Sequence, residues 1–207
     1  EQKHFVDRIY EGINRMIKLV NLLLQIARVE SGRIKIKPTP LDLAALAGEV
    51  AASLKIILDE KSQSVKISAE PKNIPLALMD KEIVWQVIQN ILTNAIRYSP
   101  SGKPINIFIT KKEDVIECAI KDSGIGIPKK QQDQIFKKFF RAENAFKMVP
   151  EGTGLGLSLV KSLVDGWGGK VWFSSEGGSE EGGGTTFFFT IPLAGMKAKE
   201  GEVGLTV

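Results

Sequence analysis

Apolar residues in the first thirty positions recur three and four apart without a break. The residues that form this seam are Val6, Ile9, Ile13, Met16, Val20, Leu23 and Ala27. A 3.5-residue period is typical of helices that supercoil in a bundle, so the sequence predicts one helix over residues 3–30. Because a lone helix cannot bury such a seam, we expect it to pack against another helix or a second copy of the chain. Packing on the domain that follows is the alternative.

Helical and strand-like patterns alternate irregularly after a linker at residues 33–40, in which residues 33–37 alternate like a short strand. The patterns predict helices over 41–61, 81–98, 129–139 and 155–165, and strands over 65–68, 76–79, 105–111, 115–121, 170–174 and 185–192. Thr153 is the expected cap of the last helix. Hairpin-linked strands favour a mixed, mostly antiparallel sheet with helices on one face, an α+β two-layer sandwich.

These patterns divide the chain into four parts. Residues 1–32 form the long helix, 33–40 the linker and 41–194 the α+β domain. Residues 195–207 are polar and contain glycine, and we expect this tail to be disordered.

Composition narrows the classes of protein that remain. Hydrophobic residues make up 43% of the chain and charged residues 25%, which is ordinary for a soluble globular protein. One Cys and one His exclude a disulfide framework and a zinc cluster of Cys and His. Cys118 lies in a strand-like run and is expected to be a small core residue. No run of about 18 apolar residues suggests a membrane span, and no signal peptide is visible at the start.

Charge is concentrated in one segment of the chain. Residues 121–147 hold seven Lys/Arg and three Asp/Glu, a surplus of +4 that equals the net charge of the whole chain. Such a local surplus suits an anionic ligand better than general nucleic-acid binding, and we expect no nucleic-acid partner. A solvated helix and loop is the simpler alternative.

Two asparagines interrupt the apolar pattern of the predicted helix 81–98. Asn90 and Asn94 are four residues apart and so share one face, with Arg97 three residues further on. Asn is a mediocre helix former that favours caps and turns. Two of them beside a basic residue indicate a polar site, although solvated outer-face positions would show the same pattern.

Glycine is also unevenly placed, since 14 of the 20 Gly follow residue 150. Residues 152–157, Gly-Thr-Gly-Leu-Gly-Leu, open a predicted helix whose free amides offer an anion site. Residues 122–128, Asp-Ser-Gly-Ile-Gly-Ile-Pro, follow a strand, so Asp122 is placed either to accept a hydrogen bond from a ligand or to hold its own loop as an Asx-turn. A Walker loop and a dinucleotide fingerprint are both absent from the sequence.

In order and spacing, five short motifs resemble the N, G1, F, G2 and G3 boxes of sensor histidine kinases. They are Asn90…Asn94-Ala95…Arg97-Tyr98-Ser99, Asp122-x-Gly124-x-Gly126-Ile127-Pro128, Phe136…Phe139-Phe140-Arg141, Gly152-Thr153-Gly154-Leu155-Gly156-Leu157 and Gly184-Thr185-Thr186-Phe187. The resemblance covers about residues 41–192. It implies the Bergerat ATP-binding fold of the GHKL superfamily, with ATP and Mg²⁺ as cofactors.

The resemblance also implies a role for each box. Asn94 would bind Mg²⁺ through its amide oxygen, a suitable hard ligand, and Asn90 would support that site. Asp122 would accept from the adenine amino group, and Arg141 would reach the γ-phosphate. Asn90, Arg97 and Arg141 are the implied catalytic residues. The implied nucleotide-binding residues are Asn90, Asn94, Arg97, Tyr98, Asp122, Gly124, Gly126, Ile127, Phe139, Gly152, Thr153, Gly154, Leu155, Gly156, Leu157, Thr185 and Thr186.

One position separates the kinases of this superfamily from its hydrolytic members, in which a Glu four residues before the metal-binding Asn activates water. Asn90 occupies that position here and cannot act as a general base at neutral pH. We therefore expect phosphoryl transfer to a protein histidine and not ATP hydrolysis. A degenerate nucleotide-binding switch without transfer activity is the alternative.

The first helix resembles the second helix of the family's dimerisation and phosphotransfer hairpin, in which the first helix carries the phosphoacceptor. His4 does not match that motif, so the acceptor histidine is expected to be absent from this chain. The resemblance implies a homodimer through the complete hairpin and a response-regulator receiver domain as partner. It also implies a cytoplasmic location, within a parent that most often is a membrane-bound sensor.

Overall fold

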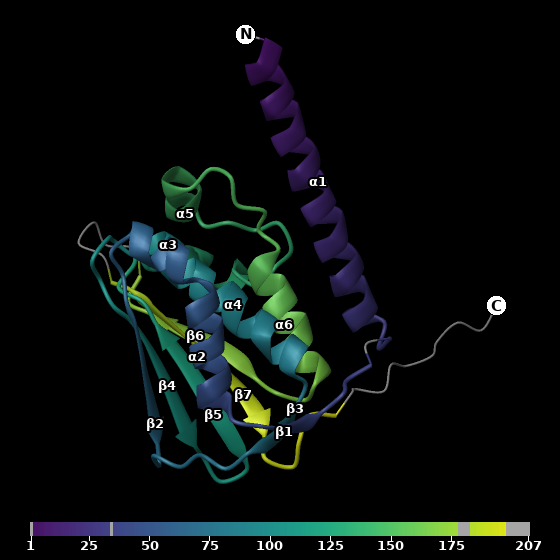
Figure 1. Ribbon diagram of the computed structural model, residues 1–207, viewed down its shortest axis with the longest axis vertical. Coiled ribbons are helices and arrows are strands. Elements are labelled where there is room, and N and C mark those ends of the chain that lie inside the picture. The colour runs from purple at the N-terminus through teal and green to yellow at the C-terminus, as the bar shows by residue number, and fades with distance from the viewer. Residues whose placement is uncertain (1, 34, 178–182, 198–207) are drawn as a thin grey trace, which may run out of the picture.

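The computed structural model describes residues 2–33, 35–177 and 183–197. Its elements are α1 Gln2–Glu30, β1 Thr39–Leu41, α2 Leu43–Ser53, α3 Lys55–Glu60, β2 Val65–Glu70, β3 Ala77–Met79, α4 Lys81–Tyr98, β4 Ile105–Lys111, β5 Val115–Lys121, a 3-10 helix Lys129–Gln134, α5 Glu143–Met148, α6 Gly156–Gly166, β6 Val171–Ser175 and β7 Thr185–Pro192. The long helix α1 extends beyond the rest of the molecule (Figure 1). No helix in the described ranges is both long and apolar enough to cross a membrane.

The main sheet has five strands in the order β2-β4-β5-β7-β6. β2 and β4 are parallel, and the other neighbours are antiparallel. Helices α2, α4 and α6 lie together over one face of this sheet (Figure 1). The predicted α+β two-layer sandwich, preceded by a long helix, is therefore confirmed.

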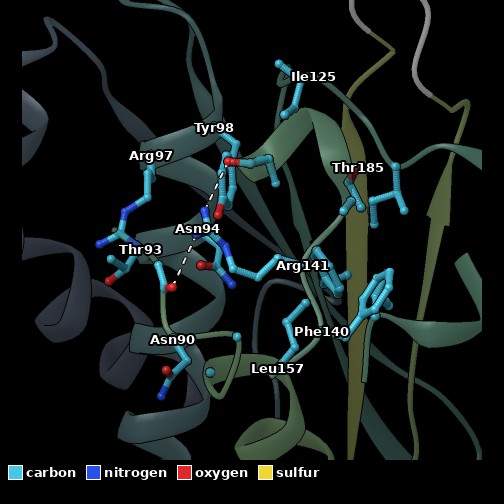
Figure 2. Close-up of a pocket in the computed structure, with 18 of the residues that line it drawn as sticks. Asn90, Thr93, Asn94, Arg97, Tyr98, Ile125, Phe140, Arg141, Leu157 and Thr185 are labelled. Carbon is cyan, nitrogen blue, oxygen red and sulfur yellow. Dashed lines mark hydrogen bonds between the residues drawn. The ribbon is translucent and has the colours of Figure 1, made fainter. Parts of the chain in front are cut away.

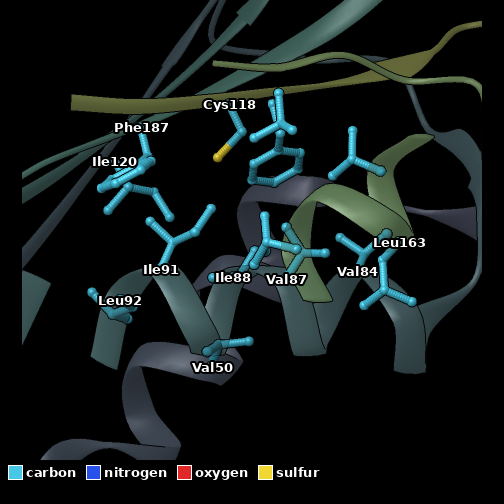
Figure 3. Close-up of a cluster of buried hydrophobic side chains, with 14 of the residues drawn as sticks. Val50, Val84, Val87, Ile88, Ile91, Leu92, Cys118, Ile120, Leu163 and Phe187 are labelled. Carbon is cyan, nitrogen blue, oxygen red and sulfur yellow. The ribbon is translucent and has the colours of Figure 1, made fainter. Parts of the chain in front are cut away.

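Helix α4 is the central element of the helical layer. Asp80 begins it, because its Oδ1 accepts from the backbone N–H groups of Glu82 (3.1 Å) and Ile83 (3.2 Å). Glu82 in the first turn and Arg97 in the last turn complement the helix dipole. The buried side chains of α4 are Ile83, Val84, Val87, Ile88, Ile91, Leu92, Ala95 and Ile96. They pack between the sheet and the other helices (Figure 3).

Alternation along the strands builds the other half of the core. Ile105, Ile107 and Ile109 of β4 are buried, and Ile109 pairs with Cys118 of β5. Cys118 and Phe187 of β7 face the helical layer (Figure 3). Burial raises the pKa of the Cys118 thiol, with the Glu117 carboxylate as a second cause, so the thiolate is disfavoured. The prediction of a core cysteine is confirmed.

Two predicted elements near the linker are wrong in extent. Residues 33–37 form no strand within the described backbone, because the N–H of Lys37 donates to Asp80 Oδ2 (2.8 Å) and not to a strand partner. The strand is β1 instead, which pairs with β3. The predicted helix 41–61 begins at Leu43, capped by Asp42, and breaks at Leu54 into α2 and α3.

The predicted helix 129–139 is only a 3-10 helix that ends at Gln134. The disordered tail expected from residue 195 is wrong at its start. Met196 is buried, and its N–H donates to the carbonyl of Leu78 (2.9 Å). Burial of this side chain against β3 extends the packed domain beyond residue 194. The remainder of the predicted tail, residues 198–207, lies outside the described residues.

Helix α1 has two different halves. Its C-terminal half docks on the sandwich through the buried side chains of Ile26 and Val29, and Gln25 exchanges amide hydrogen bonds with Gln86 of α4. In the predicted seam, Val6, Ile9, Ile13, Met16 and Val20 remain 49–65% exposed. The helix is confirmed, and packing on the following domain accounts for its C-terminal half. The bundle partner stays a prediction.

Candidate functional site

A cavity of about 320 Å³ opens between α4, the loop after β5, the segment around α5 and the start of α6. Figure 2 shows side chains from these four regions converging on it. Its volume lies within the range of pockets that hold small ligands. Leu22 of α1 and the β7 residues Thr185 and Phe187 also line it.

Helix α4 lines one side of the cavity with its polar stripe. Asn90, Asn94 and Arg97 all border the cavity, so the shared face predicted from their spacing is the ligand-facing side (Figure 2). The Asn90 amide is oriented, because its Nδ2 donates to the carbonyl of Gln86 (2.8 Å). Its Oδ1 then faces the start of α6, where a Cβ added to Gly156 would lie 3.1 Å away.

Asp122 lies at the other end of the cavity and is only 7% exposed. Its Oδ1 accepts from the N–H groups of Gly124 (2.8 Å) and Thr185 (3.0 Å), so it holds its own loop and also ties that loop to β7. Burial raises its pKa to about 6, against the smaller opposing effect of these two hydrogen bonds. The Asx-turn alternative is therefore real, and it leaves the second carboxylate oxygen available to a ligand.

The loop that carries Asp122 packs tightly against the end of α4. A Cβ on Gly124 would lie 2.7 Å from the carbonyl oxygen of Tyr98, which no side chain tolerates. Gly124 thus allows the loop to contact Tyr98 behind the cavity. Gly126 lies in the cavity wall and has φ +64°. Glycine at these two positions serves close packing and a positive φ respectively.

The glycine segment before α6 forms a third wall. Gly154 has φ +69°, and a Cβ there would lie 2.6 Å from the carbonyl carbon of Phe139. The prediction that Thr153 caps the helix is wrong: the N-cap is Leu155, which offers no side-chain cap. Thr153 instead accepts from the N–H of Leu155 (3.3 Å) and shapes the loop. The unpaired amides at the start of α6 border the cavity and suit an anion.

Arg141 reaches from the start of the α5 segment into the cavity (Figure 2). Its guanidinium donates to the carbonyls of Ala145 (3.1 Å), Val149, Pro150 (2.7 Å) and Gly152 (3.2 Å). A contact with a γ-phosphate would have to replace some of these bonds, and it stays a prediction.

The cavity brings together 14 of the 18 predicted site residues. They are Asn90, Asn94, Arg97, Tyr98, Asp122, Gly126, Ile127, Arg141, Gly152, Thr153, Gly154, Gly156, Leu157 and Thr185. The other four do not line it. Gly124 and the buried Leu155 pack behind it, Phe139 is 59% exposed with φ +64°, and Thr186 lies on β7 beside Thr185.

Several residues of the wall were not predicted from sequence. Gln89 and Thr93 flank the asparagines on α4, and their helical spacing was a signal that could have found them. Leu22 and Asn144 also line the cavity, but only the tertiary fold places them there. Asn144 is notable because it hydrogen-bonds to the loop that follows Asp122.

The donors present fit a magnesium nucleotide. The amide oxygens of Asn90 and Asn94 are hard, neutral ligands of the kind that Mg²⁺ accepts when phosphate oxygens complete its shell. Asp122 at the opposite end offers an acceptor for an exocyclic amine, and Arg97 adds positive charge to the wall.

Fold and cavity together define a nucleotide-binding module of the Bergerat type. Residues 79–195 match the family of histidine kinase-, DNA gyrase B-, and HSP90-like ATPases, and the chain belongs to this family. The relatives that match most of the chain include sensor histidine kinases.

One such relative is the sensor histidine kinase WalK of Bacillus subtilis, 34% identical in an alignment of 171 residues that covers 78% of this chain and 26% of WalK. SenX3 of Mycolicibacterium smegmatis is 28% identical over 86% of this chain and 46% of its own length. The chain therefore spans less than half the length of either relative.

Solved structures show the same fold. Full-length ShkA in complex with AMPPNP superposes with a TM-score of 0.78 at 24% identity, over 97% of this chain and 40% of ShkA. The histidine kinase ThkA in complex with the response regulator TrrA gives 0.70 at 21% identity, over 93% of this chain and 52% of ThkA.

Proposed function

We propose that this chain binds Mg-ATP in the cavity and transfers the γ-phosphoryl group to a histidine on a helix outside these 207 residues. An imidazole nitrogen would attack the γ-phosphorus, the bond from that phosphorus to the β–γ bridging oxygen would break, and ADP would leave. The phosphoryl group would then pass to an aspartate of a response regulator.

The observation that carries this proposal is the composition of the cavity wall. Among the described residues that line the cavity, the only carboxylate is Asp122, and its Oδ1 is already bonded to the backbone of two residues. Asn90, which faces the glycine segment, has a neutral amide that cannot take a proton from water. The wall can therefore position a triphosphate and its metal, but it offers no evident base for hydrolysis.

The larger assembly is also a proposal. ThkA was solved with a response regulator, but its 21% identity to this chain concerns the fold alone. The exposed seam of α1 supports a homodimer, because Val6, Ile9, Ile13 and Met16 are each more than half exposed here. We further propose that the chain acts on the cytoplasmic side of a membrane-bound sensor.

The test is a phosphotransfer assay with γ-labelled ATP and a separate helical hairpin that carries a candidate acceptor histidine. We expect acid-labile label on the hairpin, none after Asn94→Ala, and slow ATP consumption when no acceptor is present. Rapid ATP turnover without an acceptor would refute the kinase mechanism. Nucleotide binding without label on any cognate hairpin would instead indicate a switch module without transfer activity.

A further inference from the structure

The segment from Arg141 to Gly152 is folded as a unit by its first residue. The Arg141 guanidinium binds carbonyls at the end of α5 and in the turn beyond it, and it also lies over the ring of Phe146 at 5.2 Å. A cation is favourable at a helix C-terminus, where carbonyls lack partners within the helix. We call residues 141–152 the lid, because they border the cavity at Arg141, Ala142, Asn144, Ala145 and Gly152.

Burial does not hold helix α5 in place, because the buried residue of the lid, Ala142, precedes the helix. Helix α5 contains no buried side chain, and its large apolar residues Phe146 and Met148 are 57% and 44% exposed. Hydrophobic burial of α5 therefore contributes little to its attachment. Specific polar contacts must supply most of the connection between α5 and the rest of the domain.

Asn144 makes the contact that joins the lid to the loop after Asp122. Its Nδ2 donates to the carbonyls of Ile125 (3.3 Å) and Gly126 (3.0 Å), and its Oδ1 accepts from the N–H of Ala145 (2.9 Å). The amide nitrogen is thus directed at one short stretch of backbone. A second contact, from the N–H of Glu143 to Gln131 Oε1 (3.0 Å), ties the same turn to the 3-10 helix.

We propose that Asn144 is a positioning residue that fastens the lid to the nucleotide loop and so slows nucleotide release. This inference rests on the proposed function, in which the loop that carries Asp122 and Gly126 holds the adenine. The side chain itself borders the cavity, so a bound nucleotide would lie beneath the contact that Asn144 closes. Opening the lid requires both hydrogen bonds to break.

Two substitutions weaken the contact to different degrees. Asn144→Ala removes the donor, whereas Asn144→Asp puts a carboxylate in front of two carbonyl oxygens and repels them. For two partly buried hydrogen bonds we expect lid opening to increase about tenfold in Asn144→Asp, and less in Asn144→Ala. Asn73→Asp, on the exposed loop between β2 and β3, adds the same charge away from the lid and serves as the matched control.

The first measurement uses the nucleotide-free 207-residue chain and follows tryptic cleavage after Lys147, which lies in the lid. Cleavage that tracks opening should be about tenfold faster in Asn144→Asp than in the wild-type chain or the Asn73→Asp control. A cleavage rate close to that of the wild type would overturn the proposal that Asn144 fastens the lid, whatever the nucleotide-release measurement shows.

The second measurement is stopped-flow fluorescence with a ribose-labelled N-methylanthraniloyl ADP. We expect a higher dissociation rate in Asn144→Asp with little change in association, a split that a general loss of stability would not produce. Faster cleavage with an unchanged dissociation rate would overturn the role in nucleotide release. If the wild-type chain bound no labelled ADP, the proposed function would fail, and the role of Asn144 in nucleotide release would fail with it. The cleavage rates would still decide whether Asn144 fastens the lid.

Discussion

Replacement of Asp122 by asparagine should change stability and nucleotide binding in opposite directions. The carboxyl is buried between the end of β5 and the start of β7, and it accepts from Gly124 and Thr185. Burial raises its pKa from 3.8 to about 6 in the folded chain. An asparagine keeps an acceptor oxygen for both N–H groups but carries no charge to desolvate.

The size of the effect follows from the two pKa values. Because the folded chain binds the proton more tightly than the unfolded chain, protonation of Asp122 stabilises the fold fully below pH 3.8, and this stabilisation is lost as the pH rises through about 6. A pKa difference of about two corresponds to about 3 kcal/mol. Between low and neutral pH, the free energy of unfolding of the wild-type chain should therefore fall by about 3 kcal/mol relative to that of the Asp122→Asn variant.

Urea unfolding of both proteins without nucleotide, from about pH 3 to about pH 8, measures this difference. Asp133→Asn, on the exposed side of the 3-10 helix, is the reference for the loss of one negative charge. The variant Asp122→Asn should also bind ADP weakly at every pH, because its amide nitrogen would face the adenine amino group. An unfolding difference that stays constant across the pH range would refute the reasoning, since the carboxyl would then not titrate there.

Three further substitutions test the site and its support. Gly154→Ala should weaken ADP binding at least about tenfold in calorimetry, because the added Cβ meets backbone at 2.6 Å; Gly168→Ala, with φ +82° and open space around it, should leave binding unchanged. Lys61→Met removes three hydrogen bonds to carbonyls at the end of α4 and should cost about 2–3 kcal/mol in thermal or urea unfolding, whereas Lys55→Met breaks only an exposed ion pair. Asn90→Glu should introduce slow ATP hydrolysis in a phosphate-release assay, and unchanged hydrolysis would count against the role given to this position.

Local periodicity was enough to predict most of the sandwich. Helix α4 could be bounded from its apolar spacing and from Asp80 as its cap, and β4 and β5 from alternation of buried and exposed residues. These patterns arise because each element buries one face against a single layer, so its apolar residues recur at the period of the helix or strand. The asparagine pair on α4 was found for the same reason, because the helical period places both on one face.

The elements that sequence analysis misplaced depend on partners far along the chain. The N–H of Lys37 donates to the carboxylate of Asp80, which is 43 residues away, and not to a neighbouring strand. Met196 is buried against β3. The break at Leu54 leaves an apolar pattern on both sides, so periodicity alone reads one helix. Propensity and period cannot register such tertiary effects.

The same distinction applies within the site. Asn90, Asn94 and Arg97 belong to one helix and could be identified together, whereas the lid reaches the cavity through Arg141 and Asn144 in a segment without periodicity. Asn144 binds the backbone carbonyl groups of residues 125 and 126. Every residue has such a carbonyl, so the residue types at these positions do not indicate the contact. The rigid wall of the cavity is therefore readable from sequence, while the wall that must move is held by contacts to backbone that only a structure shows.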